Sequence, residues 1–177
     1  MAYTTPSTFV AGAVLTAAQL NAVQNNVRFL HGPPTVRVKR DAVLAVPTGG
    51  FEEVAFDTED WDSDTMWSST AATKVFCRTA GKYLVSAGGL LAASTGGTDR
   101  IIGIRKNSTS SDPEFGLTAA QTEPAAGGTR RGGQVCGMVE LTTGQYVQLV
   151  YFHNVGSNLN TSTDNFQPTL SMLWVSS

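Results

Sequence analysis

Residues 16–30, TAAQLNAVQNNVRFL, are the one segment whose pattern clearly predicts a helix. Thr16 suits the N-cap position, and Gln19 three residues later completes a capping box. Residues 31–34, HGPP, are expected to end the helix, because a C-terminal Gly followed by Pro is a common stop. The helix therefore divides the chain into a short N-terminal segment and a long body.

One face of this helix carries a narrow apolar seam formed by Leu20, Val23, Val27 and Leu30. Their spacing of three or four residues is typical of a buried helix face. A helix this short is marginal alone in water, so the seam must be covered. Two alternatives remain open: the seam packs on the body of the same chain, or on copies of itself.

The segment before the helix, residues 1–15, has no charged side chain and is too apolar for an ordinary disordered tail. We interpret it as an extended arm that gains order by lying on another surface. That surface is either its own domain or another protein. The residues expected to dock are Tyr3, Phe9, Val10 and Val14.

After the helix the pattern is that of β-structure with short turns. Residues 82–94, KYLVSAGGLLAAS, are nearly uncharged and predict a central strand buried on both faces. Residues 108–131 predict a long exposed connection with one short strand near 115–118. Further strands are expected at 36–39, 42–46, 51–56, 73–78, 100–106, 134–141, 145–154 and 169–175. Many short strands after one helix predict an all-β sandwich or barrel.

Composition narrows the functional classes. A chain of 177 residues suits one domain, or one domain with an appendage. Its net charge of −2 gives no reason to expect a nucleic-acid partner. No apolar run approaches the ~20 residues that span a bilayer, so we expect a soluble cytosolic product without membrane insertion. Cys77 and Cys136 are expected to be buried free thiols, although a bridge between them remains open.

Nothing in the sequence supports catalysis. His31 and His153 have no Cys, Asp or Glu at metal-ligand spacing, and nucleotide-binding and serine-hydrolase motifs are missing. We therefore expect no enzyme, no catalytic residue and no cofactor. An enzyme would need a deep pocket with convergent polar groups around His153.

The acidic segment 57–67, DTEDWDSDTMW, is expected to be a loop. Alternate carboxylates make weak candidates for a Ca²⁺ site, although no EF-hand pattern follows: Asp60, Asp62 and Asp64. The other interpretation is a solvated loop held by packing of its large apolar side chains on the core, namely Trp61, Met66 and Trp67.

Trp61 and Trp67 are also candidates for ligand contact, since exposed aromatic rings can stack on a sugar. Tyr151 and Trp174 could offer similar faces. Burial in a core or an interface is the more usual fate of large aromatic residues in strands. This alternative therefore depends on their exposure.

The body resembles the C1q/TNF-like jelly-roll family in five short motifs. These are FEEVAFDTEDWD (51–62), AGKYLVSAGGL (80–90), RIIGIRKN (100–107), VELTTGQYVQLVYFH (139–153) and TLSMLWV (169–175). Gln145 stands where the family usually has Asp. The resemblance implies a jelly roll and a homotrimer whose subunits pack around a threefold axis through apolar and aromatic strand faces.

Residues 1–30, with the core LTAAQLN at 15–21, resemble the N-terminal segment of many small tailed-bacteriophage structural proteins. Together the two resemblances imply a virion protein with an attachment and assembly module at 1–34 and a jelly roll at 35–177. The helix seam would then line the trimer axis.

Three functions remain open, of which the first two follow from these resemblances and the third from the aromatic residues, and each predicts different partners. The first is a homotrimeric tail-tip or fibre protein that binds other virion proteins and contacts a host-surface glycan. The second is a capsid decoration protein that reinforces the head. The third is a free carbohydrate-binding module, which would be a monomer with exposed Trp. In the first two cases the protein, made in the host cytoplasm, resides in the virion.

Overall fold

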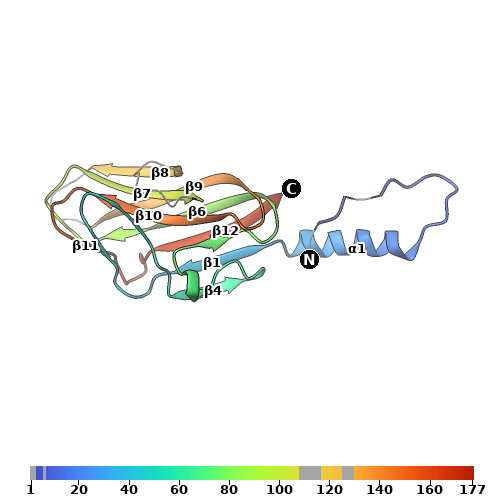
Figure 1. Ribbon diagram of the computed structural model, residues 1–177, viewed down its shortest axis with the longest axis horizontal. Helices are drawn as coiled ribbons and strands as arrows, with labels where there is room; N and C mark the ends of the chain where they lie inside the picture. Colours follow the sequence, from blue (N-terminus) through green and yellow to red (C-terminus); the bar gives the residue numbers. More distant parts are fainter. Residues whose placement is uncertain (1–2, 6, 108–116, 125–129) are drawn as a thin grey trace.

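The computed structural model describes residues 3–5, 7–107, 117–124 and 130–177, and shows one helix projecting from a β head (Figure 1). Helix α1 spans Ala17–His31. The predicted capping box is confirmed: Thr16 Oγ1 accepts the Gln19 N–H at 3.3 Å, and Gln19 Oε1 accepts the Thr16 N–H at 2.9 Å. At the other end, the Gly32 N–H donates to the carbonyl of Arg28. Within the described residues, no helix has the length and hydropathy required to cross a membrane.

The head consists of two stacked sheets and a small ribbon. The first sheet has the order β4 (Thr58–Asp62), β1 (Thr35–Lys39), β12 (Thr169–Ser176), β6 (Gly81–Leu91) and β9 (Arg131–Leu141). The second has the order β3 (Phe51–Glu53), β10 (Tyr146–His153), β7 (Asp99–Lys106) and β8 (Leu117–Pro124), with β5 (Val75–Phe76) also paired to β10. The ribbon joins β2 (Ala45–Val46) to β11 (Leu159–Asn160), and a 3-10 turn η1 spans Ser69–Ala71.

All strand pairs of the described residues are antiparallel, and the predicted all-β sandwich is confirmed. Alternation places one face of each strand in a shared core. On β12 the buried residues are Leu170, Met172 and Trp174, as their spacing predicts. Burying this apolar face between the sheets is the main force that holds the head together.

The expectation that residues 82–94 are buried on both faces is wrong. Strand β6 ends at Leu91 and alternates, with Tyr83 and Val85 fully buried but Leu84 exposed. The run has little charge because, after Lys82, its outward positions are Leu, Ser and Gly, and the outer face of this sheet is exposed at Leu84, Met138 and Leu173. In this strand, the lack of charge therefore marks an outer face that is exposed to solvent in the single chain.

One expected strand lies further along the chain than predicted, and one expected loop contains a strand: the short strand predicted near 115–118 is found at 117–124. Leu117–Pro124 is strand β8, which pairs with β7 at seven positions, while 108–116 and 125–129 lie outside the described residues. In the acidic segment, Thr58–Asp62 is strand β4, paired with β1. Both strands lie at the ends of their sheets, where polar residues with low β-propensity are tolerated.

Candidate functional site

The helix seam is not covered by the chain's own body. Leu20, Val23, Val27 and Leu30 are between 38% and 60% exposed. The helix instead buries an adjoining side through Asn26 and Phe29. Of the two alternatives left open by the sequence, packing of the seam on its own domain is therefore wrong, and the seam remains available to a second molecule.

The N-terminal arm runs back along the helix (Figure 1). The Asn26 side chain clamps it: Nδ2 donates to the carbonyl of Thr4 at 2.6 Å, and Oδ1 accepts the N–H of Thr4 at 2.9 Å. The Tyr3 ring lies 6.4 Å from the ring of Phe29. The arm thus lies on the helix of its own chain. The sequence alone did not decide between this surface and another protein.

Of the residues expected to dock, only Tyr3 is partly buried in this way. Phe9, Val10 and Val14 are exposed, and so is Leu15. They lie around the turn between arm and helix, where the Ala13 N–H donates to the carbonyl of Val10. Figure 1 places this turn at the end of the module farthest from the head, so the module presents an apolar tip.

The helix joins the head through two aromatic side chains. Phe29 packs edge-on against Trp174 of β12, with 4.7 Å between ring centroids. The indole Nε1 of Trp174 donates to the carbonyl of Ala80 at 3.2 Å. Gly81 has φ +151°, and a Cβ there would overlap that indole. A glycine is therefore required at 81 for the Trp174 side chain to reach the base of the helix.

A second apolar surface lies on the outer face of the first sheet, near the helix. Leu84 pairs with both Met138 and Leu173, and all three point outward. Val175 adds to this patch, and Met138 is 57% exposed. The sequence analysis did not identify this patch, because only the pairing of β6 with β9 and β12 brings its residues together. The signal available in the sequence was that apolar residues also occupy outward positions, which alternate with the core residues along these strands.

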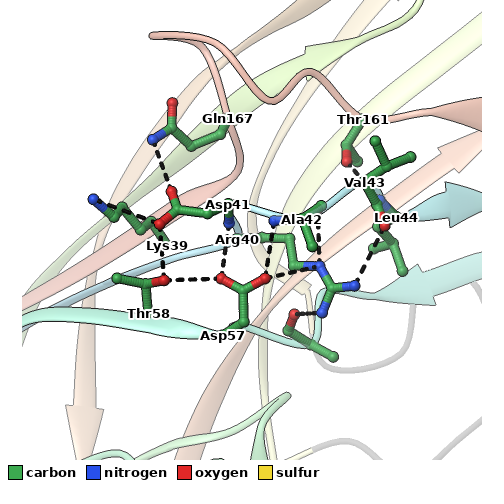
Figure 2. A network of polar contacts seen from close by, with 11 residues as sticks. Lys39, Arg40, Asp41, Ala42, Val43, Leu44, Asp57, Thr58, Thr161 and Gln167 are labelled. Atoms are coloured by element: carbon green, nitrogen blue, oxygen red, sulfur yellow. Dashed lines mark hydrogen bonds and ion pairs between the residues drawn. The ribbon is translucent and has the colours of Figure 1, made fainter.

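Asp57 is the centre of a polar network at the start of β4 (Figure 2). Its carboxylate accepts the N–H groups of Asp41 and Ala42 at 2.8 and 2.9 Å, and lies 3.4 Å from the guanidinium of Arg40. The hydroxyl of Thr58 donates both to this carboxylate and to that of Asp41. The network fixes the chain after β1 against β4.

The three weak candidates for Ca²⁺ bind protein groups separately. Asp60 pairs with Arg37 and Lys39 at 3.2 and 3.1 Å. Asp62 accepts the Trp67 N–H at 2.8 Å, and Asp64 accepts the Thr79 hydroxyl at 2.9 Å. Among the described residues, no group of three or more His, Cys, Asp or Glu side chains is placed to hold a metal ion.

The aromatic candidates for ligand contact have different environments. Trp174 and Tyr151 are buried, Trp67 is half-buried, and only Trp61 is exposed. The guanidinium of Arg37 lies 5.6 Å from the centroid of the Trp61 ring. The expectation that Trp61 packs on the core is therefore wrong, since it lies on the outer face of β4.

His153 is fully buried, and both its ring nitrogens are used. Nε2 donates to the carbonyl of Val46 at 2.9 Å, and Nδ1 accepts the N–H of Val155 at 3.4 Å. Three hollows on the described residues are lined by other side chains and not by His153.

The two thiols are free, and only one is buried. Cys77 is enclosed in the core, and burial raises the pKa of its thiol. Cys136 is exposed on the outer face of the first sheet, opposite Ser86. The expectation of a buried thiol is wrong for Cys136, because it shares the face of Met138.

Comparison with known proteins identifies the fold. No protein-family model and no curated protein sequence matches the chain. Among solved structures, murine APRIL at pH 5.0 superposes with a TM-score of 0.60 and 9% identity, over 80% of this chain and 98% of that one. The globular domain of zebrafish complement 1qA gives a TM-score of 0.51 and 14% identity, over 80% and 97%. The head is thus a C1q/TNF-like jelly roll, as predicted.

Proposed function

We propose that this chain is a non-enzymatic structural protein of a tailed-bacteriophage virion, a homotrimer whose residues 1–34 assemble and attach it. Its jelly-roll head faces outward. The phage assignment depends on the resemblance of residues 1–30 to phage structural proteins, and the trimer on the resemblance of the body to C1q/TNF-like proteins. The uncovered helix seam and the apolar tip support the part that concerns assembly and attachment through residues 1–34.

The observation that carries the proposal is the uncovered seam on α1. Leu20, Val23, Val27 and Leu30 form an apolar stripe on a helix that stands away from the head (Figure 1). Exposed contiguous apolar stripes mark interaction sites. A second copy of the same stripe is the simplest complement, because three identical helices around a threefold axis cover one another's seams.

The apolar patch on the head supports the same assembly. Leu84, Met138, Leu173 and Val175 lie at the end of the sheet where β12 meets the helix. Self-association through this patch and through the seam would use adjoining surfaces of one molecule. The trimer would therefore be stabilised by head and helix together.

The exposed tip of the module suits attachment to a particle. Phe9, Val10, Val14 and Leu15 are presented at the point farthest from the head. An apolar tip of this kind fits a hydrophobic recess on another virion protein. We favour a tail-tip or fibre position with a role in host contact, and the alternative is a capsid decoration protein. Both locations offer threefold or pseudo-threefold platforms.

Immunogold labelling of purified particles, with an antibody against residues 35–177, tests this proposal. We expect gold at the tail tip. Gold spread over the capsid would favour the decoration alternative. Particles that carry no label, from a lysate in which the protein is abundant, would refute the virion assignment.

A further inference from the structure

A hollow of about 590 Å³ opens on the outer face of the first sheet. It is lined by Gly88 and Gly89 of β6, by Gly133 of β9, and by residues 165–167 of the loop before β12, namely Asn165, Phe166 and Gln167. Thr169, the first residue of β12, also lines it. Since Trp174 near the other end of β12 meets the helix, the hollow lies at the end of the head remote from the module.

The loop that carries Phe166 is anchored on Asp164. One carboxylate oxygen accepts the Phe166 N–H at 3.0 Å and the Ser162 hydroxyl at 2.8 Å. The other pairs with Arg130, whose guanidinium lies 5.9 Å from the Phe166 ring centroid. The hydrogen bond from Arg130 holds the pKa of Asp164 at about 2, so this anchor persists at neutral pH. Phe166 consequently remains 55% exposed in a fixed loop.

The charged groups around the hollow are already neutralised. Arg37, which lines it, pairs with Asp60 at 3.2 Å, and Arg130 pairs with Asp164. An anionic ligand would have to compete with these carboxylates. The hollow therefore favours a ligand without net charge.

Three carboxamides supply the polar contacts. Gln134 donates its Nε2 to the Ser86 hydroxyl at 2.9 Å, and Gln167 donates its Nε2 to Asp41 at 3.2 Å. Each of these two side chains thus keeps its carbonyl oxygen as an acceptor, and Asn165 is exposed at the rim. One aromatic face beside several amide acceptors and donors matches a ring that is apolar on its face and hydroxylated at its edge.

We propose that this hollow binds an uncharged saccharide, one ring of which stacks on Phe166 while its hydroxyl groups contact Gln134, Asn165 and Gln167. The volume lies within the usual range for small-ligand sites. The site gives a ligand class to the host-contact role proposed above and rests on that role only for its biological setting. It also differs from the Trp61 and Trp67 surface expected from the sequence.

Saturation-transfer NMR on the full chain, with the methyl glycosides of glucose, galactose, mannose and N-acetylglucosamine as probes, tests the site. We expect saturable transfer to at least one probe. Phe166→Ala should weaken its binding by about tenfold or more. Gln134→Trp, which fills the hollow from an exposed strand position, should abolish it. The matched control is Phe9→Ala, because Phe9 is 53% exposed but lies in the arm.

Binding that survives both substitutions, or the lack of saturable binding to all four probes, would overturn the saccharide site. The oligomeric mass of the same samples separates this result from the proposed assembly. A trimer that binds none of the probes refutes only the saccharide site. A monomer that binds a probe, with loss on Phe166→Ala, supports the site and contradicts the proposed trimer.

Discussion

Replacing Asp57 by Ala should destabilise the head measurably, because one carboxylate organises the chain between β1 and β4 (Figure 2). The substitution removes the acceptor for two backbone N–H groups, at 2.8 and 2.9 Å, and the partner of Arg40. Hydrogen bonds to a charged group contribute roughly 1.5–3 kcal/mol each, and water can replace part of them at this half-exposed position. We therefore expect a loss of about 2 kcal/mol in the free energy of unfolding.

For a chain of this size, that loss corresponds to a decrease in Tm of about 4–8 °C. The measurement is thermal unfolding followed by circular dichroism at a fixed chain concentration, because assembly makes Tm concentration-dependent. Glu59→Ala is the matched control, since Glu59 is an exposed carboxylate two residues further along, on β4. It should change stability by less than about 0.5 kcal/mol.

The difference should also depend on pH. Burial raises the pKa of Asp57, but the hydrogen bonds from Asp41, Ala42 and Thr58 and the charge of Arg40 lower it below its ordinary value of 3.8 overall. A carboxyl whose pKa is lowered in the folded state stabilises it above the unfolded pKa, and this stabilisation is lost as pH falls through the folded pKa. The gap in Tm between wild type and Asp57→Ala should thus be full at neutral pH and close in acid. Equal Tm values at pH 7, or an equal loss with Glu59→Ala, would refute the reasoning.

Three further predictions concern the module and the outer sheet face. Val23→Asp with Val27→Asp should place like charges in the shared seam and lower the sedimentation coefficient. The control Asn21→Asp with Asn25→Asp, at the same spacing, should leave the sedimentation coefficient unchanged. A double seam variant that still sediments as a trimer would show that the helix is not part of the interface. Asn26→Ala should release the arm, seen as faster amide exchange at Thr4, and unchanged exchange would show that Asn26 does not hold it. Maleimide should modify Cys136 more slowly as chain concentration rises, while Cys77 should stay unreactive until the chain unfolds. A modification rate at Cys136 that does not depend on chain concentration would show that Cys136 lies outside any interface.

Local signals in the sequence were sufficient for the elements that depend on local chemistry. The ends of α1 followed from Thr16, Gln19 and Gly32, because capping involves residues only three or four positions apart. The alternation of Leu170, Met172 and Trp174 likewise identified the core face of β12. These features needed no knowledge of distant partners.

Features that depend on distant residues could not be predicted in the same way. Strand β8 has few β-branched residues and exists through its pairing with β7. The clamp of Asn26 on Thr4 joins residues 22 positions apart through a side chain that could equally have faced water. The hollow beside Phe166 requires β6, β9 and the loop before β12 to meet.

The solution mass of the full chain, and of a shortened chain beginning at Pro33, tests the central claim most directly. Light scattering should give three times the chain mass of 18.7 kDa for the full chain. A shortened chain that is also trimeric would show that the head carries assembly and leaves the module free for attachment. If only the full chain is trimeric, the helix is the assembly element. A full chain that is monomeric at all concentrations would contradict the account and favour a free carbohydrate-binding module.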